Sequence, residues 1–163
     1  MLKAKKSIDF AMFTFSNTSG IDDTMLRLAK VQPRLRIRGV LDRSQGSQAW
    51  APTQDLKAAG VELHANKSGV GVRKVHHKLM VIDEQLVIAG SFNYTEPATI
   101  FNDENIIVIG DAEAAARVTA AIAAGTPIVL DAAASARAGE APGRSIVTPH
   151  AGELARFLGR DRD

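Results

Sequence analysis

A histidine and a lysine two residues apart are the residues of this sequence whose types and spacing most clearly suggest chemistry. They stand in HHKLMVID, residues 76–83, where charged side chains interrupt an apolar run. Side chains alternate between faces in a strand, so His76 and Lys78 share one face and His77 takes the other. An imidazole beside an ammonium suits a phosphate group, because the lysine neutralises anionic charge while the imidazole attacks or shuttles a proton. Asp83 ends the strand on the opposite face, where we expect it to organise the turn or a neighbouring side chain.

Polar residues downstream extend the phosphate hypothesis. In GSFN, residues 90–93, Ser91 and Asn93 are two apart, so both can converge from one side of an extended segment and donate to an anion. The N-terminus of the helix expected after them adds partial positive charge. In NDEN, residues 102–105, Glu104 can orient and polarise a histidine, as supporting carboxylates do at other sites.

The elements that must position these residues alternate between strands and helices. Residues 7–15, SIDFAMFTF, are apolar on both alternating faces, which is typical of a strand buried on both sides; a short buried helix remains an alternative. The expected strands are 7–15, 34–42, 61–65, 75–83, 85–90 and 105–110. The expected helices are 21–30, 53–60 and 94–102. A turn at 83–85 predicts a hairpin, and the order β-α-β-α-β-β-β-α-β indicates an α/β fold with a mixed sheet flanked by helices.

Composition excludes several classes of site. The chain has 163 residues, a net charge of +2 and no cysteine, so disulfides and thiolate metal sites are excluded. No apolar run reaches the roughly 20 residues that a membrane helix needs. The first residues, MLKAKKSIDF, show no signal-peptide pattern. We expect no stable membrane association.

Together, these motifs resemble the signature of the phospholipase D superfamily. The resemblance is carried by His76-x-Lys78-x4-Asp83 followed by Gly90-Ser91-x-Asn93, and SIDFAMFTFSN, IRGVLDRSQGS and NDENIIVIG also match. It covers about residues 1–110 and is similar to the superfamily's short, single-motif bacterial endonucleases. It implies a layered phospholipase D/nuclease-like fold that is incomplete at its N-terminus, because the chain starts almost on the first strand. The location, bacterial cytoplasm or periplasm, remains open.

The resemblance also implies a mechanism without metal or cofactor. One histidine attacks phosphorus and forms a phosphohistidine, while another protonates the leaving oxygen and then activates water. Because this chain carries one motif, the active site must be completed in a homodimer, with His76 from each subunit at a two-fold axis. The substrate implied is nucleic acid, either DNA or RNA.

Residue roles follow from the same resemblance. The motif implies a catalytic set of His76, Lys78, Asp83 and Glu104, in which His76 is nucleophile or acid, Glu104 orients His76 and Asp83 is structural. Phosphate binding is implied for Lys78, Ser91 and Asn93. No metal ligand is implied.

Residues after about 110 differ in composition. Sixteen of residues 111–163 are alanine, whereas all eight lysines lie at or before Lys78. The start of this segment, DAEAAARVTAAIAAG, is expected to form a helix that can cover the sheet. Further on, TPIVLDA and TPHAGELARFLG resemble a fragment of the ADP/ATP-dependent NAD(P)H-hydrate dehydratase family, which is ribokinase-like. That family's phosphate loop and catalytic aspartate are absent, so no such activity is assigned, and His150 is interpreted as merely exposed. We predict different origins for residues 1–110 and 111–163.

Rival interpretations remain open. The same site could act on a phospholipid, although no amphipathic basic helix or anchor favours this. Alternatively, the chain is an inactive, truncated or fused product that cannot assemble the dimer site. His64 is interpreted as an ordinary strand residue, and His77 as packed or hydrogen-bonded. Six basic residues form either a track for a nucleic-acid backbone or a solvated surface: Arg34, Arg36, Arg38, Arg43, Arg73 and Lys74.

Overall fold

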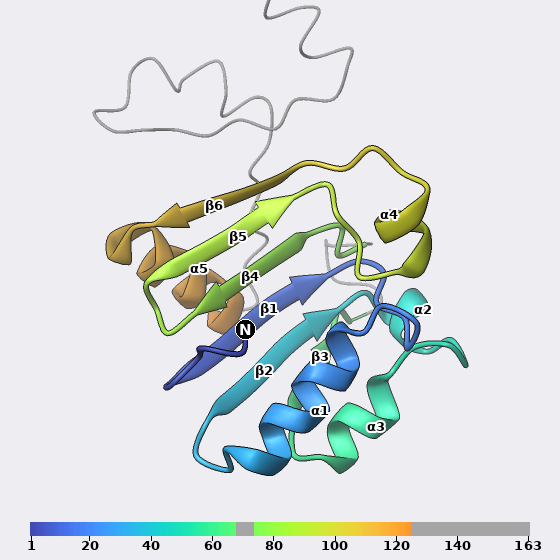
Figure 1. Cartoon of the computed structure of the whole chain (residues 1–163), viewed down its shortest axis with the longest axis horizontal. Helices are drawn as coiled ribbons and strands as arrows, with labels where there is room; N and C mark the ends of the chain where they lie inside the picture. Colours follow the sequence, from blue (N-terminus) through green and yellow to red (C-terminus); the bar gives the residue numbers. More distant parts are fainter. Residues whose placement is uncertain (68–73, 125–163) are drawn as a thin grey trace, which may run out of the picture. The chain divides into compact units, whose positions relative to one another are not determined.

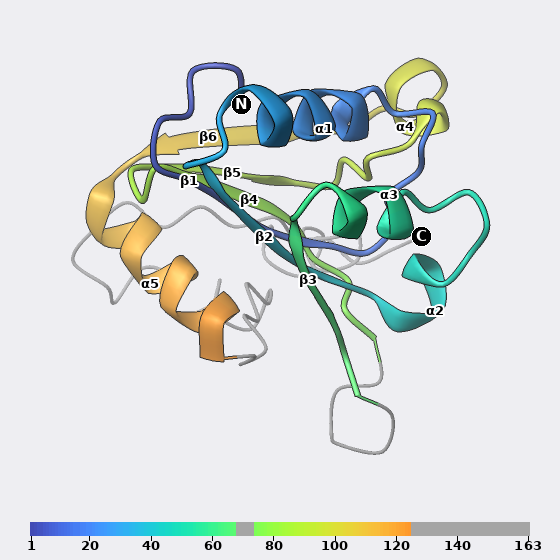
Figure 2. The same cartoon turned by 90° about the horizontal axis from the view of Figure 1, so that it is seen from below.

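A mixed β-sheet with helices on both faces organises the described part of the chain (Figures 1 and 2). The computed structural model describes residues 1–67 and 74–124. The strands are β1 (Ser7–Met12), β2 (Arg36–Leu41), β3 (Glu62–Ala65), β4 (Lys78–Ile82), β5 (Leu86–Gly90) and β6 (Ile106–Gly110). The helices are α1 (Ile21–Val31), α2 (Arg43–Gly46), α3 (Thr53–Ala58), α4 (Glu96–Ile100) and α5 (Ala112–Ala124). The predicted fold class is confirmed, and the six expected strands are present.

The strand order is β3-β2-β1-β4-β5-β6. Strands β1, β2 and β3 run parallel, because helical crossovers join them. Strand β4 pairs antiparallel with β1, and β5 and β6 continue antiparallel to their neighbours. The carboxyl ends of β1, β2 and β5 therefore lie at the same end of the sheet as the start of β4.

The two faces of the sheet are covered by different helices. The main core joins Ile8, Phe10 and Met12 of β1 to Met25 of α1 and Leu56 of α3. On the opposite face α5 packs against β1, β4 and β5, and Figure 2 shows it across the sheet from α1. All six residues of β1 are buried, so the prediction of a strand buried on both sides is confirmed and the alternative of a short helix is wrong.

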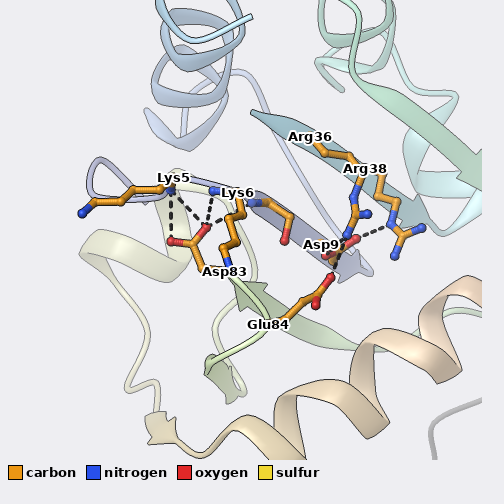
Figure 3. Close-up of polar contacts among 8 residues, drawn as sticks. Lys5, Lys6, Asp9, Arg36, Arg38, Asp83 and Glu84 are labelled. Atoms are coloured by element: carbon orange, nitrogen blue, oxygen red, sulfur yellow. Dashed lines mark hydrogen bonds and ion pairs between the residues drawn. The ribbon is translucent and has the colours of Figure 1, made fainter. Parts of the chain in front are cut away.

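A buried carboxylate lies within this central strand. Asp9 has no exposed surface, and the parallel register sets Arg38 of β2 directly beside it. The Arg38 Nε donates to Asp9, and Arg36 Nη2 lies 3.5 Å from the other carboxylate oxygen (Figure 3). Arg36 also pairs with Glu84 at 3.2 Å. Burial of Asp9 is possible because these guanidinium groups supply the charge and hydrogen bonds that water would otherwise provide.

The turn between β4 and β5 holds the start of the chain. Its central residues, Asp83 and Glu84, both have left-handed backbone conformations, with φ of 55° and 57°, as a tight hairpin turn requires. The Asp83 carboxylate accepts the backbone N–H groups of Lys5 at 3.0 Å, Lys6 at 2.6 Å and Ser7 at 3.0 Å (Figure 3). Asp83 thus joins the start of β1 and the residues before it to the end of β4.

Several boundaries differ from the prediction: the strand expected over 7–15 ends at Met12, and the helix expected over 94–102 covers Glu96–Ile100. Strand β4 begins at Lys78, so His76 and His77 precede it instead of lying in a strand over 75–83. The chain stays extended there, since the Phe13 N–H donates to the His77 carbonyl at 2.8 Å. Helix α2 was not expected, because its four residues are too few to show a helical period. Arg73, His150 and the TPIVLDA and TPHAGELARFLG stretches lie outside the described residues.

Replacement of Asp83 by asparagine should destabilise the fold by about 1–3 kcal/mol, the range for losing a charged hydrogen-bond acceptor. Asparagine tolerates the left-handed conformation, so the change isolates the carboxylate. Burial raises the pKa of Asp83, but the N–H groups of Lys6, Ser7 and Lys5 outweigh it, and the net pKa lies below 3.8. The stabilisation is therefore present above the unfolded-state pKa and is lost as the pH falls through the lower folded-state pKa.

Urea unfolding monitored by circular dichroism at neutral and acidic pH measures this effect. The matched control is Glu84→Gln, in the same turn, whose ion pair with Arg36 is half exposed and should contribute less than about 1 kcal/mol. Equal losses for the two variants at neutral pH would contradict the role given to Asp83.

Candidate active site

One end of the sheet gathers most of the residues that the motifs single out. Strand β4 starts there with Lys78, preceded by His76, and β5 ends there with Gly90, followed by Ser91. The antiparallel register pairs Leu79 with Ala89, so the segments just beyond this pair run side by side. The segment 91–105, which carries α4, extends from the same end (Figure 1).

His76 and Lys78 point to the same side, as the alternation of an extended chain predicts. The Lys78 ammonium lies 3.3 Å from Nε2 and 3.4 Å from Nδ1 of His76, and it donates to the His76 carbonyl at 3.1 Å. His76 is exposed, whereas Lys78 is half-buried. The pair therefore presents an imidazole and an ammonium together at the surface of the sheet end.

An aromatic ring supports this pair. The Phe13 ring lies 4.6 Å from the His76 ring, centroid to centroid. The ammonium groups of Lys74 and Lys78 stand 4.9 and 5.3 Å from the same Phe13 centroid. Such contacts attract a cation to the face of an aromatic ring. Sequence reasoning assigned Phe13 no role, since its meeting with His76 depends on the pairing of β1 with β4.

The surroundings favour the neutral imidazole. Partial desolvation of the ring against its neighbours lowers the pKa of His76, and the positive charges of Lys78 and Lys74 lower it further, while the negative charge of Asp42 opposes them. Burial also lowers the pKa of Lys78, against the opposing charge of Glu104. A neutral imidazole has a free lone pair, which is the form required of a nucleophile or a general base.

Glu104 and Ser91 bind each other. The Ser91 hydroxyl donates to Glu104, and Asn102 Nδ2 donates to the other Glu104 oxygen at 3.0 Å. The same hydroxyl accepts the Asn105 N–H at 3.0 Å. In this chain, Ser91 therefore positions Glu104, and Glu104 acts on Lys78 by charge. Its orientation of His76 and the contact of Ser91 with phosphate stay predictions.

Gly90 allows this network to form. A β-carbon at Gly90 would lie 2.1 Å from the Asn105 carbonyl oxygen, far inside van der Waals contact. The absence of a side chain lets the backbones of Ser91 and Asn105 approach, with the Ser91 N–H 3.1 Å from the Asn105 carbonyl. Close packing against the Asn105 backbone therefore explains why the GSFN motif has glycine at position 90.

Asn93 is held in a well-fixed segment. Backbone hydrogen bonds join Tyr94 to both Thr14 (3.1 Å) and Ser16 (2.8 Å), and Tyr94 is buried against Phe15. Within the described part of the chain, Asn93 Oδ1 is buried and has no hydrogen-bond partner. An unpaired buried amide oxygen is costly, and only a hydrogen-bond donor could satisfy it.

The remaining candidates lie elsewhere or already have partners. Asp83 is at the opposite end of β4 from Lys78. His64 lies on β3 and contacts Glu62 at 2.9 Å. His77 is partly buried, and its pKa is lowered by burial and by the charges of His76 and Lys78. Of the predicted basic track, Arg36 and Arg38 are ion-paired with Asp9, while Lys74 stands beside the His76 pair.

Across residues 1–67 and 74–124, no group of three or more His, Cys, Asp or Glu side chains is arranged to hold a metal ion. In the same residues, no helix has both the length and the apolar character to cross a membrane.

Residues 1–124 match the protein family described as "Cardiolipin synthase, PLD-like domain", so the chain belongs to the phospholipase D superfamily. A mitochondrial cardiolipin hydrolase of Chlamydomonas reinhardtii is 32% identical over 108 residues, which are 66% of this chain and 46% of that protein. A phospholipase D of Rickettsia conorii is 32% identical over 117 residues, 69% of this chain and 54% of that protein. The chain spans about half the length of these curated relatives.

Solved structures share the fold. The phospholipase D family member Nuc from Salmonella typhimurium superposes with a TM-score of 0.60 at 23% identity, covering 72% of this chain and 76% of that one. NucT from Helicobacter pylori superposes with a TM-score of 0.62 at 18% identity, with the same coverage. The predicted family and fold are confirmed. The family match reaches residue 124 and so includes α5. The different origin predicted for residues 111–163 stays a prediction.

The variant Gly90→Ala should be destabilised by about 1–3 kcal/mol, the usual cost of an added methyl group in a packed position. It should also lower any activity of the site, because the Asn105 backbone must move and Glu104 with it. The matched control is Gly110→Ala at the other end of the same strand pair, where an added β-carbon meets nothing within 4 Å. Thermal unfolding of both variants measures the difference, and equal melting temperatures would refute the packing role of Gly90.

Proposed function

We propose that this chain is one subunit of a metal-independent phosphodiesterase that cleaves nucleic acid through a phosphohistidine. The observation that carries the proposal is the His76–Lys78 pair, with 3.3 Å between the ammonium and the imidazole at the end of the sheet. The lowered pKa of His76 supports a neutral, nucleophilic ring at neutral pH. Membership of the phospholipase D superfamily supports phosphodiester chemistry.

In the first step, a ring nitrogen of His76 attacks phosphorus, and the bond from phosphorus to the leaving oxygen breaks. The leaving oxygen takes a proton from a second imidazole, which must be cationic at that moment. The Lys78 ammonium neutralises charge that builds on the phosphoryl oxygens. In this proposal Asn93 donates its amide N–H groups to the same oxygens.

In the second step, water attacks the phosphorus of the phosphohistidine, and the phosphorus–nitrogen bond breaks. The second imidazole, neutral after the first step, takes the proton from water and becomes cationic again. The products are a phosphomonoester and an alcohol, and both imidazoles return to their starting protonation states. The two rings titrate as a coupled pair, since each changes the charge that the other experiences.

The second imidazole comes from a second copy of the chain. Among the described residues, His77 precedes Lys78 directly and takes the other side of the extended segment, and His64 is on β3. Neither can face His76 across one phosphate. An isologous two-fold contact between sheet ends supplies the missing group, because it brings His76 of each subunit to the axis.

Nucleic acid and phospholipid are both phosphodiesters, so the chemistry alone does not separate them. The resemblance to single-motif endonucleases favours nucleic acid, and exposed Lys74 beside the pair adds cationic charge for a polyanion. The names of the relatives, phospholipase D and cardiolipin hydrolase, favour the lipid as the second candidate.

Replacing His76 by alanine should abolish hydrolysis while the fold is retained, because the ring is exposed and forms no part of the core. Plasmid DNA, RNA and cardiolipin vesicles should be assayed side by side in excess EDTA. We expect EDTA-resistant cleavage of nucleic acid, lost in His76→Ala and retained in the control His64→Ala. Unchanged cleavage in His76→Ala would overturn the mechanism. Faster cleavage of cardiolipin than of DNA or RNA would select the lipid candidate.

Mixing wild-type and His76→Ala subunits tests the shared site. If each active site needs two His76 rings, activity after random reassembly should fall with the square of the wild-type fraction, to about one quarter in an equal mixture. Independent sites in each chain would leave about one half. Light scattering on the same samples gives the oligomeric state. A folded, inactive monomer would instead favour the interpretation of a truncated or fused product.

A further inference from the structure

Asp42 is a buried carboxylate that contacts the segment carrying His76. Asp42 follows β2 and precedes α2, at the end of the sheet that carries His76 (Figure 1). It is 2% exposed, and its backbone N–H donates to the Met12 carbonyl at 3.2 Å. Asp42 is therefore fixed against the end of β1, next to the element that supplies Phe13.

The two oxygens of Asp42 have different partners. Oδ1 accepts the N–H groups of Ser44 at 3.0 Å and Gln45 at 3.2 Å, together with the Ser44 hydroxyl at 2.6 Å. Oδ2 accepts the N–H of Val75 at 3.0 Å, across 33 positions of the chain. Only a carboxylate offers acceptors on both sides, since an asparagine would turn its NH₂ group toward one set of donors. Capping of α2 explains the first set and leaves the Val75 contact unexplained.

That contact fixes the residue directly before His76. On the other side of His76, the His77 carbonyl accepts the Phe13 N–H at 2.8 Å. The His76 backbone is therefore held from both sides, by Asp42 through Val75 and by β1 through His77. The side chain, which is itself exposed, is then positioned by its backbone and by the Phe13 ring.

We propose that Asp42 is a positioning residue for His76, acting through the Val75 N–H and through its negative charge behind the imidazole. This inference rests on the proposed function, in which His76 attacks phosphorus. Asp42 does not touch the substrate. It holds the imidazole against Phe13 and beside Lys78, in the geometry that attack requires.

The charges around His76 agree with this assignment. Lys78 of β4 and Lys74 of the preceding segment lower the pKa of His76, and Asp42 at the end of β2 raises it. His77 is adjacent, and Glu104 acts on Lys78. Asp42 is thus the carboxylate that opposes the two lysines at His76, and it favours the protonated ring that a general acid needs.

The test is Asp42→Asn, with two independent readouts. The first is NMR titration of the His76 ring, identified among the four histidines by its loss in His76→Ala. Removing the negative charge should move the His76 midpoint to lower pH. The second is steady-state hydrolysis of nucleic acid, where kcat should fall on the order of 10- to 100-fold with little change in KM, as a displaced catalytic group predicts.

The matched control is Ser44→Ala. It removes the hydroxyl bond to the same carboxylate and leaves the Val75 contact intact, so a purely structural role predicts comparable effects in both variants. We expect Ser44→Ala to leave the His76 titration and kcat unchanged. If Asp42→Asn does not fold, Asp42→Ser takes its place, since its shorter side chain can cap α2 but cannot reach Val75.

An unchanged His76 midpoint in a folded Asp42 variant, or equal effects in Ser44→Ala, would overturn the inference. A wild-type protein that hydrolyses nothing would overturn the proposed function alone. The titration would still decide whether Asp42 acts on His76.

Discussion

The antiparallel pairing of β1 with β4 is the constraint on which the site depends. At one end of this pair, Asp83 accepts the backbone N–H groups of Lys5, Lys6 and Ser7, and at the other the Phe13 N–H donates to the His77 carbonyl. A slip of one residue would turn Lys78 to the other face of the sheet. The two contacts prevent this by fixing both ends of the register. The aspartate and the histidine of one motif thus act at opposite ends of one strand.

Around the His76 end, two ammonium groups and an imidazole lie against one aromatic ring. Lys74, Lys78 and His76 all lie against Phe13, and Asp42 and Glu104 are the carboxylates whose charges act on the pair. Both carboxylates are committed to other donors, Asp42 to the α2 N-terminus and Glu104 to Ser91 and Asn102. An entering phosphate would relieve the remaining repulsion, and the cationic groups need little rearrangement to meet it. This is electrostatic preorganisation for an anion.

Features with a short sequence period were predictable, and features that depend on register were not. The six strands follow from apolar runs, and the common side of His76 and Lys78 follows from alternation along the chain. The Asp9–Arg38 pair, the Phe13–His76 contact and the Asp42–Val75 hydrogen bond each join strands or loops far apart in sequence. Nothing local distinguishes Phe13 from Phe15, or Asp42 from an ordinary helix cap. Glu104 and Ser91 were each picked out by their motifs, but the hydrogen bond between them was not predicted. It forms because Gly90 lets the Asn105 backbone come alongside.

The carboxyl groups that hold the fold titrate at lower pH than an ordinary imidazole does. Asp42 and Asp83 serve the same physical purpose at opposite ends of the sheet, each accepting several backbone N–H groups. Those hydrogen bonds outweigh burial and hold the pKa of both carboxyl groups below the ordinary 3.8. Both therefore remain ionised between mildly acidic and neutral pH, a range that includes the ordinary histidine pKa of 6.5. The scaffold is therefore constant while His76 changes charge, and a change in activity between mildly acidic and neutral pH reports on the imidazole pair and not on loss of the fold.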